Sequence, residues 1–272
     1  RGEFINFPPE ELDPLYRYVQ EQGLSFGIHL PLFQPSWLAE KGLYLALIDH
    51  SAERRELFFR LVEENLQWGK RWGADYLLVH LQRVMLFDHL QNGDFSIREA
   101  EAIAQAGVAR LESLAQRYGI PIVLENALGC RFFYHVEQYL SLFENSSWLR
   151  FCLDIGHLLI DASLYDFCAE EFIQQLAPYT QEIHLYNKPV IGKLTEISFE
   201  KFQELRQKFP VHPSQTPAEG WNDTEAVLRI ILRRRPDCLI TFESHPSLYP
   251  DYRYTQEGIQ WVKALCRQIL TG

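Results

Sequence analysis

The chain has 272 residues, of which 47% are hydrophobic and 14% aromatic, and its formal net charge is -10. This length suits one barrel of about 250 residues, so we expect a single domain over residues 1–272. The negative charge repels phosphate backbones and anionic lipid heads, so it argues against nucleic acids and membranes as partners. We therefore expect a small-molecule substrate, and a homo-oligomer is compatible with this charge balance.

Cysteine usage and hydropathy indicate a cytoplasmic protein. The five cysteines are scattered and show no CxxC spacing, so neither a disulfide framework nor a thiolate zinc site is expected. No uninterrupted apolar stretch reaches about 18 residues, the length of a membrane-spanning helix. The first residues, RGEFINF, lack the basic start and the apolar region of a secretory signal.

In chain order, short apolar runs alternate with stretches of helical periodicity, and no Gly/Ser-rich linker interrupts them. Runs that are too short for a helix and free of alternation are typical of strands in a parallel sheet buried on both faces. The clearest helices are predicted at Ala52–Trp72 and Ile97–Tyr118. Seven strands are predicted, at Phe4–Phe7, Leu24–Leu30, Tyr76–Leu81, Ile120–Glu125, Arg150–Asp154, Glu182–Tyr186 and Leu239–Glu243.

This alternation predicts an α/β fold, and more narrowly a (β/α)8 TIM barrel. Seven strands are one short of a closed barrel. The run Lys208–His212 could be the eighth strand, but Pro210 breaks it and cannot donate to a ladder. We therefore favour a strand that precedes Arg1, so that this sequence lacks the first strand or has an atypical one.

Every predicted strand after the first ends in a residue type that can bind a metal. In a barrel the carboxyl ends of the strands converge on one mouth, where residues far apart in sequence can meet around one cation. Carboxylates are almost never fully buried unless they are paired, so three of them at matching strand ends favour a metal site over independent burial. The residues concerned are His29, His80, Glu125, Asp154, His184 and Glu243.

Five motifs extend this pattern: LEN with Glu125, DIGH with Asp154 and His157, IHLYN with His184, AEGWND at 218–223, and FES with Glu243. Together they resemble the xylose isomerase-like TIM barrels, the superfamily that also holds endonuclease IV and many sugar isomerases and epimerases. The resemblance covers nearly the whole chain. It implies a divalent ion, commonly manganese, zinc, magnesium or cobalt, bound by the glutamate, aspartate, histidine, glutamate quartet: Glu125, Asp154, His184 and Glu243.

The interpretation we favour is a metal-dependent isomerase or epimerase of a sugar, sugar phosphate or related polyol. In that branch one ion binds adjacent substrate oxygens, and the two metal-site glutamates, here Glu125 and Glu243, move a proton at the carbon beside the carbonyl. His157 would then donate to a substrate hydroxyl. A neutral sugar is not repelled by an acidic protein.

The alternative is hydrolysis of a phosphoester on a cluster of two or three metals. His29 and His80 lie where endonuclease-IV-like members carry extra metal-binding histidines, and they are equally suited to contact a substrate at the mouth. The Asp-x-His pair of that pattern is absent, because His212 and Ser214 occupy the corresponding places before Ala218-Glu219-Gly220. A small phosphoester is therefore expected rather than DNA, with His157 and His212 as further possible ligands. A barrel that has lost catalysis is a third reading.

Two further residues are candidates for substrate contact. Lys188 follows the strand that carries His184, on a loop expected over the mouth, where an ammonium could bind a sugar phosphate or polarise a carbonyl. Trp37 follows HLPLFQPS and could stack on a sugar ring. Each of these residues could also have a purely structural place, Lys188 on the surface and Trp37 over the core.

Overall fold

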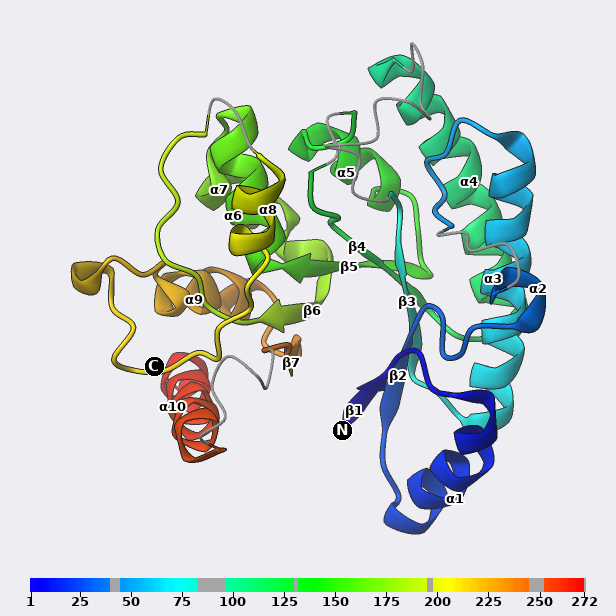
Figure 1. Ribbon diagram of the computed structural model, residues 1–272, viewed down its shortest axis with the longest axis horizontal. Helices are drawn as coiled ribbons and strands as arrows, with labels where there is room; N and C mark the ends of the chain where they lie inside the picture. The colour runs from blue at the N-terminus through cyan, green and yellow to red at the C-terminus, as the bar shows by residue number, and fades with distance from the viewer. Residues whose placement is uncertain (40–44, 83–95, 130–131, 195–197, 245–251, 272) are drawn as a thin grey trace. The chain divides into compact units, whose positions relative to one another are not determined.

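The computed structural model describes residues 1–39, 45–82, 96–129, 132–194, 198–244 and 252–271 (Figure 1). These residues form two compact units. Unit 1 contains residues 1–133 and 137–150, and unit 2 contains residues 134–136 and 151–272. None of the described helices is long and apolar enough to cross a membrane. The single domain expected over the whole chain stays a prediction.

Unit 1 contains a parallel sheet whose four strands pair in chain order. The register places His80 opposite Glu125 on neighbouring strands, so the strand ends that were predicted to carry ligands lie level with each other. The strands are β1 (Gly2–Phe4), β2 (Phe26–His29), β3 (Tyr76–His80) and β4 (Ile122–Glu125). The first strand was predicted too late in the chain, at 4–7, because Asn6 adopts a left-handed backbone with φ 53° and ends the extended stretch.

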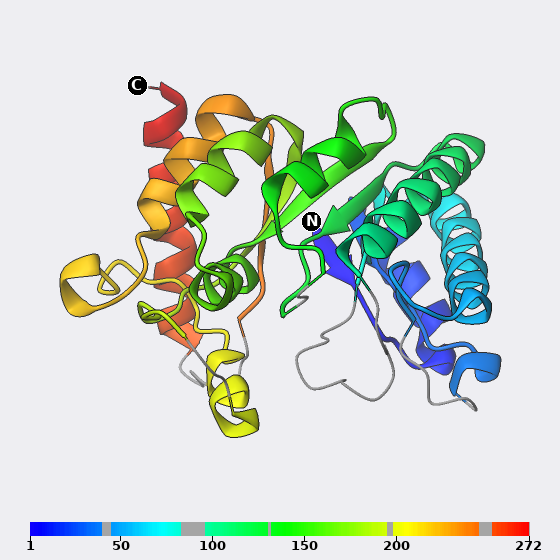
Figure 2. The same ribbon diagram turned by 90° about the horizontal axis from the view of Figure 1, so that it is seen from above.

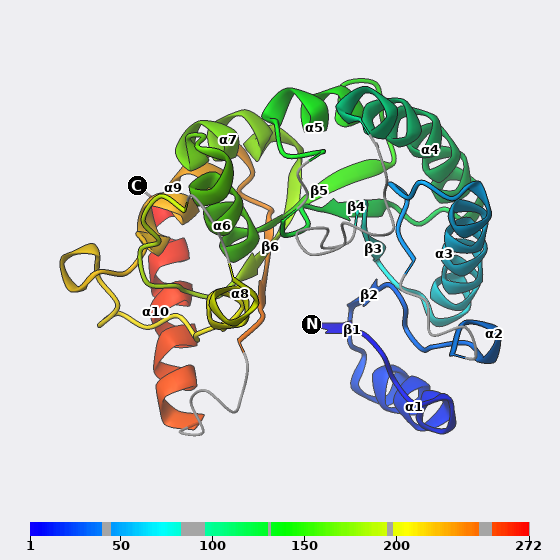
Figure 3. The ribbon, with the colours of Figure 1, turned by 45° about the horizontal axis from the view of Figure 1, so that its top comes forward.

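Helices α3 (Ala52–Trp72) and α4 (Ile97–Tyr118) run side by side along the strands of unit 1 (Figure 3), and both have the predicted bounds. Each begins at a serine that accepts a hydrogen bond from the first helical turn, Ser51 and Ser96. Each is followed by a left-handed glycine. The other helices are α1 (Leu12–Gln22), α2 (Ser36–Ala39) and α5 (Val136–Phe143), with a 3-10 turn at Pro9–Glu11.

A buried amide of α3 fixes the loop that follows β2. The Asn65 side chain accepts a hydrogen bond from the backbone N–H of Leu32 at 2.8 Å and donates one to the Leu61 carbonyl at 2.8 Å. Asn65 is 1% exposed, so both of these polar contacts are made out of water, where losing a partner costs most. The chain beyond His29 is therefore tied to the helix behind it.

Unit 2 contains three parallel strands that pair in chain order: β5 (Leu149–Asp154), whose first two residues belong to unit 1, then β6 (Thr180–Leu185) and β7 (Leu239–Phe242). Asp154 lies opposite His184 in the register. Helix α9 (Thr224–Arg234) packs beside α10 (Tyr252–Thr271) (Figure 2). The remaining helical elements are α6 (Ile155–Tyr165), α7 (Ala169–Leu176), α8 (Phe199–Leu205) and the 3-10 turns Ala177–Tyr179 and Pro217–Glu219.

The run Lys208–His212 is not a strand, as its proline predicted. Phe209 makes an isolated antiparallel bridge with Asn187, whose backbone N–H donates to the Phe209 carbonyl at 2.8 Å. The described part of the chain therefore has seven strands. The bridge holds the segment after α8 against the loop that leaves β6.

Candidate functional site

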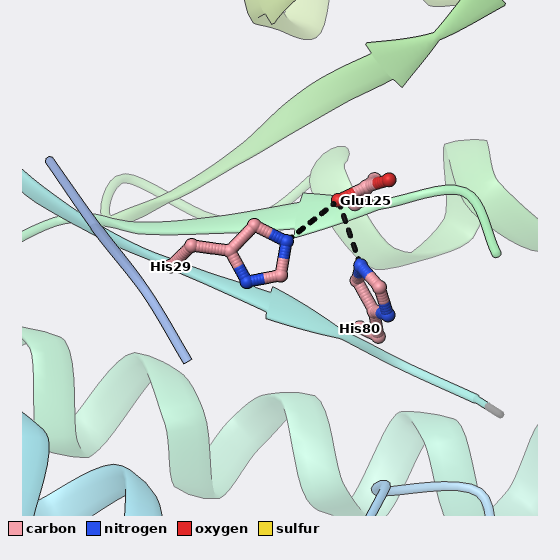
Figure 4. A group of neighbouring side chains, drawn as sticks. All are labelled: His29, His80 and Glu125. Atoms are coloured by element: carbon pink, nitrogen blue, oxygen red, sulfur yellow. Dashed lines mark hydrogen bonds and ion pairs between the residues drawn. The ribbon is translucent and has the colours of Figure 1, made fainter. Parts of the chain in front are cut away.

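Three predicted residues of unit 1 meet where β2, β3 and β4 end. His80 Nε2 lies 2.8 Å from Glu125 Oε2, and His29 Nε2 lies 3.5 Å from the same oxygen. Figure 4 shows the two imidazoles directed at that one carboxylate oxygen. The Glu125 side chain is almost completely buried, with 2% of its surface exposed, and the two imidazoles are among its polar contacts.

This group can act in either of the two ways that the sequence left open. A nitrogen from each histidine and an oxygen of Glu125 lie within 4.8 Å of one another, close enough to share a metal ion. Without an ion, the His80 imidazole hydrogen-bonds the buried carboxylate, and the His29 imidazole lies beside it. The edge-on arrangement of the rings, with centroids 5.0 Å apart, is compatible with both.

A cavity of about 680 Å³ adjoins His80 in unit 1. Its walls come from the segments that follow β1 and β2 and from α3, with Pro31 and Leu38 among the apolar contributors. This volume lies within the range of about 300–1,000 Å³ that is typical of small-molecule sites. His80 thus lines a space large enough for a small molecule.

The predicted residues Asp154, His184 and Glu243 come together in unit 2. One potential ligand atom of each lies within 4.8 Å of the others, and His184 Nδ1 is 3.4 Å from Glu243 Oε2. Asp154 and His184 are completely buried, whereas 35% of the Glu243 side chain is exposed. Two carboxylates and one imidazole form a donor set that suits zinc, manganese or magnesium, so these three residues fit a divalent ion.

The DIGH motif turns directly from β5 into α6. Asp154 caps α6, because its Oδ1 accepts from the His157 backbone N–H at 2.8 Å, and the same oxygen accepts from the Tyr186 hydroxyl at 2.6 Å. Those two bonds fix the carboxylate and direct Oδ2 to the side where His157 Nδ1 lies 3.4 Å away. His157 thus contacts the carboxylate of the predicted ligand.

The DIGH motif needs a glycine at position 156, because no room is left there for a side chain. A Cβ at Gly156 would lie 2.3 Å from the Tyr186 ring and 2.5 Å from the Cε of Lys188. Only a residue without a side chain lets Tyr186 approach α6 closely enough to reach Asp154.

Lys208 belongs to the same group and was not predicted. Its Nζ lies 2.5 Å from Glu243 Oε1 and 3.6 Å from Asp154 Oδ2, and it stands over the Tyr186 ring at 4.8 Å from the centroid. The sequence offered one indication, a lysine beside the proline-broken run at 208–212, but that run was considered only as a strand. The ammonium brings a positive charge directly to two predicted metal ligands.

Lys188, predicted to contact substrate, is buried at 3% exposure and donates through Nζ to the carbonyls of Leu205 and Gln207. The pKa of its ammonium is lowered to about 8, chiefly by burial and in part by the nearby Lys208, while Asp154 opposes the shift. Its contacts hold the end of α8 beside the loop after β6. A substrate role for Lys188 stays a prediction.

The two remaining candidates contact helices. The Trp37 indole N–H donates to Glu64 at 3.1 Å, and the Arg60 guanidinium stands 4.4 Å over its ring, so this side chain lies against α3. His212 lies against α10, with Nε2 3.3 Å from Glu257 and its ring stacked on Tyr254. Among the described residues, no cluster of three potential ligands includes His212.

The quartet predicted from the sequence is distributed over both units. Glu125 lies in unit 1, while Asp154, His184 and Glu243 lie in unit 2. The structure of unit 2 brings three of the four together, and the structure of unit 1 groups Glu125 with His29 and His80. Completion of a four-ligand site by Glu125 stays a prediction.

Several solved structures have a fold similar to that of this chain. The structure of a D-tagatose 3-epimerase-like protein is similar at TM-score 0.68 and 16% identity, covering 99% of this chain and 89% of that one. A xylose isomerase-like TIM barrel protein from Mycobacterium smegmatis, in complex with magnesium, matches at TM-score 0.59 and 12% identity over 97% and 80%. Endonuclease IV from Thermus thermophilus matches at TM-score 0.54 and 16% identity over 98% and 99%.

At these identities the likeness concerns the fold. No curated protein matches the sequence. The family described as xylose isomerase-like TIM barrel matches residues 3–265, nearly the whole chain, and this confirms the TIM-barrel fold predicted from the alternating elements. The chain therefore belongs to the xylose isomerase-like TIM-barrel family.

Proposed function

We propose that this protein is a divalent-metal-dependent isomerase or epimerase that acts on a sugar, sugar phosphate or related polyol. One observation carries the proposal: Asp154, His184 and Glu243 present two carboxylates and an imidazole within 4.8 Å of one another, at the carboxyl ends of parallel strands. Structural likeness to an L-ribulose 3-epimerase, at TM-score 0.63, and to the D-tagatose 3-epimerase-like protein supports this choice.

In this proposal Asp154, His184 and Glu243 hold the ion, and Glu125 is the fourth ligand by sequence resemblance. Bound there, a divalent ion such as Mn²⁺, Zn²⁺, Mg²⁺ or Co²⁺ supplies Lewis-acid polarisation of a substrate carbonyl. Asp154 is suited to the ligand role alone, because it is completely buried and two hydrogen bonds to Oδ1 fix its orientation.

Glu243 is suited to proton transfer. It is the one partly exposed member of the three, so its carboxylate can reach the carbon beside a substrate carbonyl, remove a proton there and return it. Glu125 is the second glutamate of this exchange by resemblance. His157, oriented by Asp154, is placed to donate a hydrogen bond to a substrate hydroxyl.

Hydrolysis of a small phosphoester is the second candidate. It is favoured by the His29, His80 and Glu125 group of unit 1, whose atoms are close enough to hold an ion of its own, and by the likeness to endonuclease IV. Against it stands His212, which contacts α10 through Glu257 and Tyr254 in place of a ligand cluster.

The test is proton exchange. Ketoses and ketose phosphates are incubated in D₂O with metal-loaded protein, and deuterium at the carbon beside the carbonyl is followed by NMR. We expect exchange in the wild type and its loss in Glu243→Gln, because the amide cannot accept the proton. Hydrolysis of a generic phosphodiester without any exchange would favour the second candidate. If the metal-loaded protein shows neither proton exchange nor hydrolysis, that result would favour a barrel without catalysis.

A further inference from the structure

Lys208 occupies the position of a cation between two predicted metal ligands. Its Nζ contacts Glu243 Oε1 at 2.5 Å and is 3.6 Å from Asp154 Oδ2. Its backbone segment is held in place from both sides: Phe209 accepts from Asn187 at 2.8 Å, and Gln207 accepts from the Lys188 ammonium at 2.8 Å. The chain therefore fixes the root of this side chain and directs its charge to the two carboxylates.

An ammonium and a divalent ion compete for these oxygens. An ion bound to Asp154 and Glu243 would share ligand atoms with Lys208, and two cations at so short a separation repel each other. The Lys208 side chain is 24% exposed and has a flexible stem, so it can leave the carboxylates without unfolding its segment.

We propose that Lys208 is an internal counter-ion that neutralises Asp154 and Glu243 until a divalent ion replaces it, and that the displaced ammonium then binds an anionic group of the substrate. This inference rests on the proposed metal-dependent function. In the metal-free protein Lys208 prevents repulsion between the carboxylates. In the loaded protein the ammonium has lost those partners and faces the same site.

Two neighbouring contacts support a place for the Lys208 ammonium after the divalent ion has displaced it. The Tyr186 ring lies within 4.8 Å of Lys208 Nζ and 5.2 Å of Lys188 Nζ, so a ring face is available to a displaced ammonium as well as to a fixed one. Lys188 is held by backbone carbonyls and is not displaced. Lys208 is thus the lysine of the pair whose charge can move between carboxylates and a ligand.

The test is calorimetric titration of Mn²⁺ into chelator-treated protein, without substrate. Lys208→Met removes the charge at similar length, Lys208→Arg keeps it, and Lys201→Met removes an exposed lysine that is paired with Glu204 at 2.9 Å. We expect Lys208→Met to bind Mn²⁺ about tenfold more tightly than the wild type, the size of one charge-assisted contact. Lys208→Arg and Lys201→Met should stay within about twofold of the wild type, because neither change removes a cation from the site.

Equal or weaker binding by Lys208→Met, with clear binding by the wild type, would overturn the inference and leave the proposed function standing. No Mn²⁺ binding by any folded variant would overturn both. If Lys208→Met unfolds without metal, the titration is replaced by thermal melting of Lys208→Gln with and without Mn²⁺. A larger rise in melting temperature on adding Mn²⁺ than in the wild type supports the competition between Lys208 and the ion. An equal rise refutes it.

The claim that the displaced Lys208 ammonium binds an anionic group is tested with inorganic phosphate. It should bind the Mn²⁺-loaded wild type about tenfold more tightly than loaded Lys208→Met, since a charge-assisted contact is lost in the variant. The two metal-free proteins should bind phosphate equally weakly. Equal phosphate affinity of the loaded proteins would overturn the anion-binding role of the displaced ammonium.

Discussion

Replacing Gly156 by alanine tests how the DIGH turn builds the site. The added Cβ would lie 2.3 Å from the Tyr186 Cε2 atom, 2.4 Å from its hydroxyl and 2.5 Å from the Lys188 Cε, all closer than atoms can approach. Tyr186 must therefore move, and the hydrogen bond from its hydroxyl to Asp154 is lengthened or lost. Overpacking in a well-packed interior costs about 1–3 kcal/mol, and a hydrogen bond to a charged group contributes about 1.5–3 kcal/mol.

We therefore expect Gly156→Ala to lower the free energy of unfolding by about 2.5–6 kcal/mol, measured by urea denaturation followed by circular dichroism. Gly192→Ala is the matched control, because a Cβ there meets nothing within 4 Å, and it should change stability by less than about 0.5 kcal/mol. Mn²⁺ affinity should fall in Gly156→Ala alone, since Asp154 loses the contact that orients it. A variant with wild-type stability and metal affinity would refute this reasoning.

Three further predictions concern the same unit. Tyr186→Phe removes the 2.6 Å hydrogen bond to the buried Asp154 carboxylate and should destabilise the metal-free protein by about 1.5–3 kcal/mol; an unchanged urea midpoint would contradict this. Lys188→Met tests a pH effect: burial lowers the pKa of Lys188 from 10.5 to about 8, so between these values the unfolded chain holds a proton that the folded chain has released. The free energy of unfolding of the wild type, relative to that of Lys188→Met, should therefore rise from pH 8 to pH 10.5. If urea denaturation gives the same difference between the two proteins at every pH in this range, the lowered pKa of Lys188 is refuted. His157→Ala, whose ring contacts Asp154 at 3.4 Å, should slow proton exchange in substrate while leaving Mn²⁺ affinity within about threefold, and loss of the ion in titrations would make His157 a ligand.

The predictable part of the fold is the part with local signals. Ala52–Trp72 and Ile97–Tyr118 have sharp bounds because serines accept hydrogen bonds at their starts and left-handed glycines end them. The strand ends were predictable because a polar residue after a buried apolar run marks where the chain leaves the sheet. The structure confirms that His80 and Glu125 lie side by side, as do Asp154 and His184.

The unpredicted part arises from contacts distant in sequence. Tyr186 reaches Asp154 across 32 residues, and Lys208 reaches the same carboxylate from an irregular segment that has no hydrophobic period. Trp37 shows the converse case: a loop was expected there and suggested a stacking surface, yet Trp37 lies in α2, and Arg60 and Glu64 one turn apart on α3 provide its partners. Side-chain reach from loops depends on backbone turns that sequence periodicity does not encode.

The most direct test of a single-ion isomerase is the metal content per chain, measured by elemental analysis of protein purified without chelator. We expect about one divalent ion in the wild type, lost in Asp154→Asn and Glu125→Gln and retained in His80→Ala. Retention in Glu125→Gln would remove that residue from the ligand set. A folded wild type without metal, or a content of about two to three ions that falls in His80→Ala, would contradict the single-ion account.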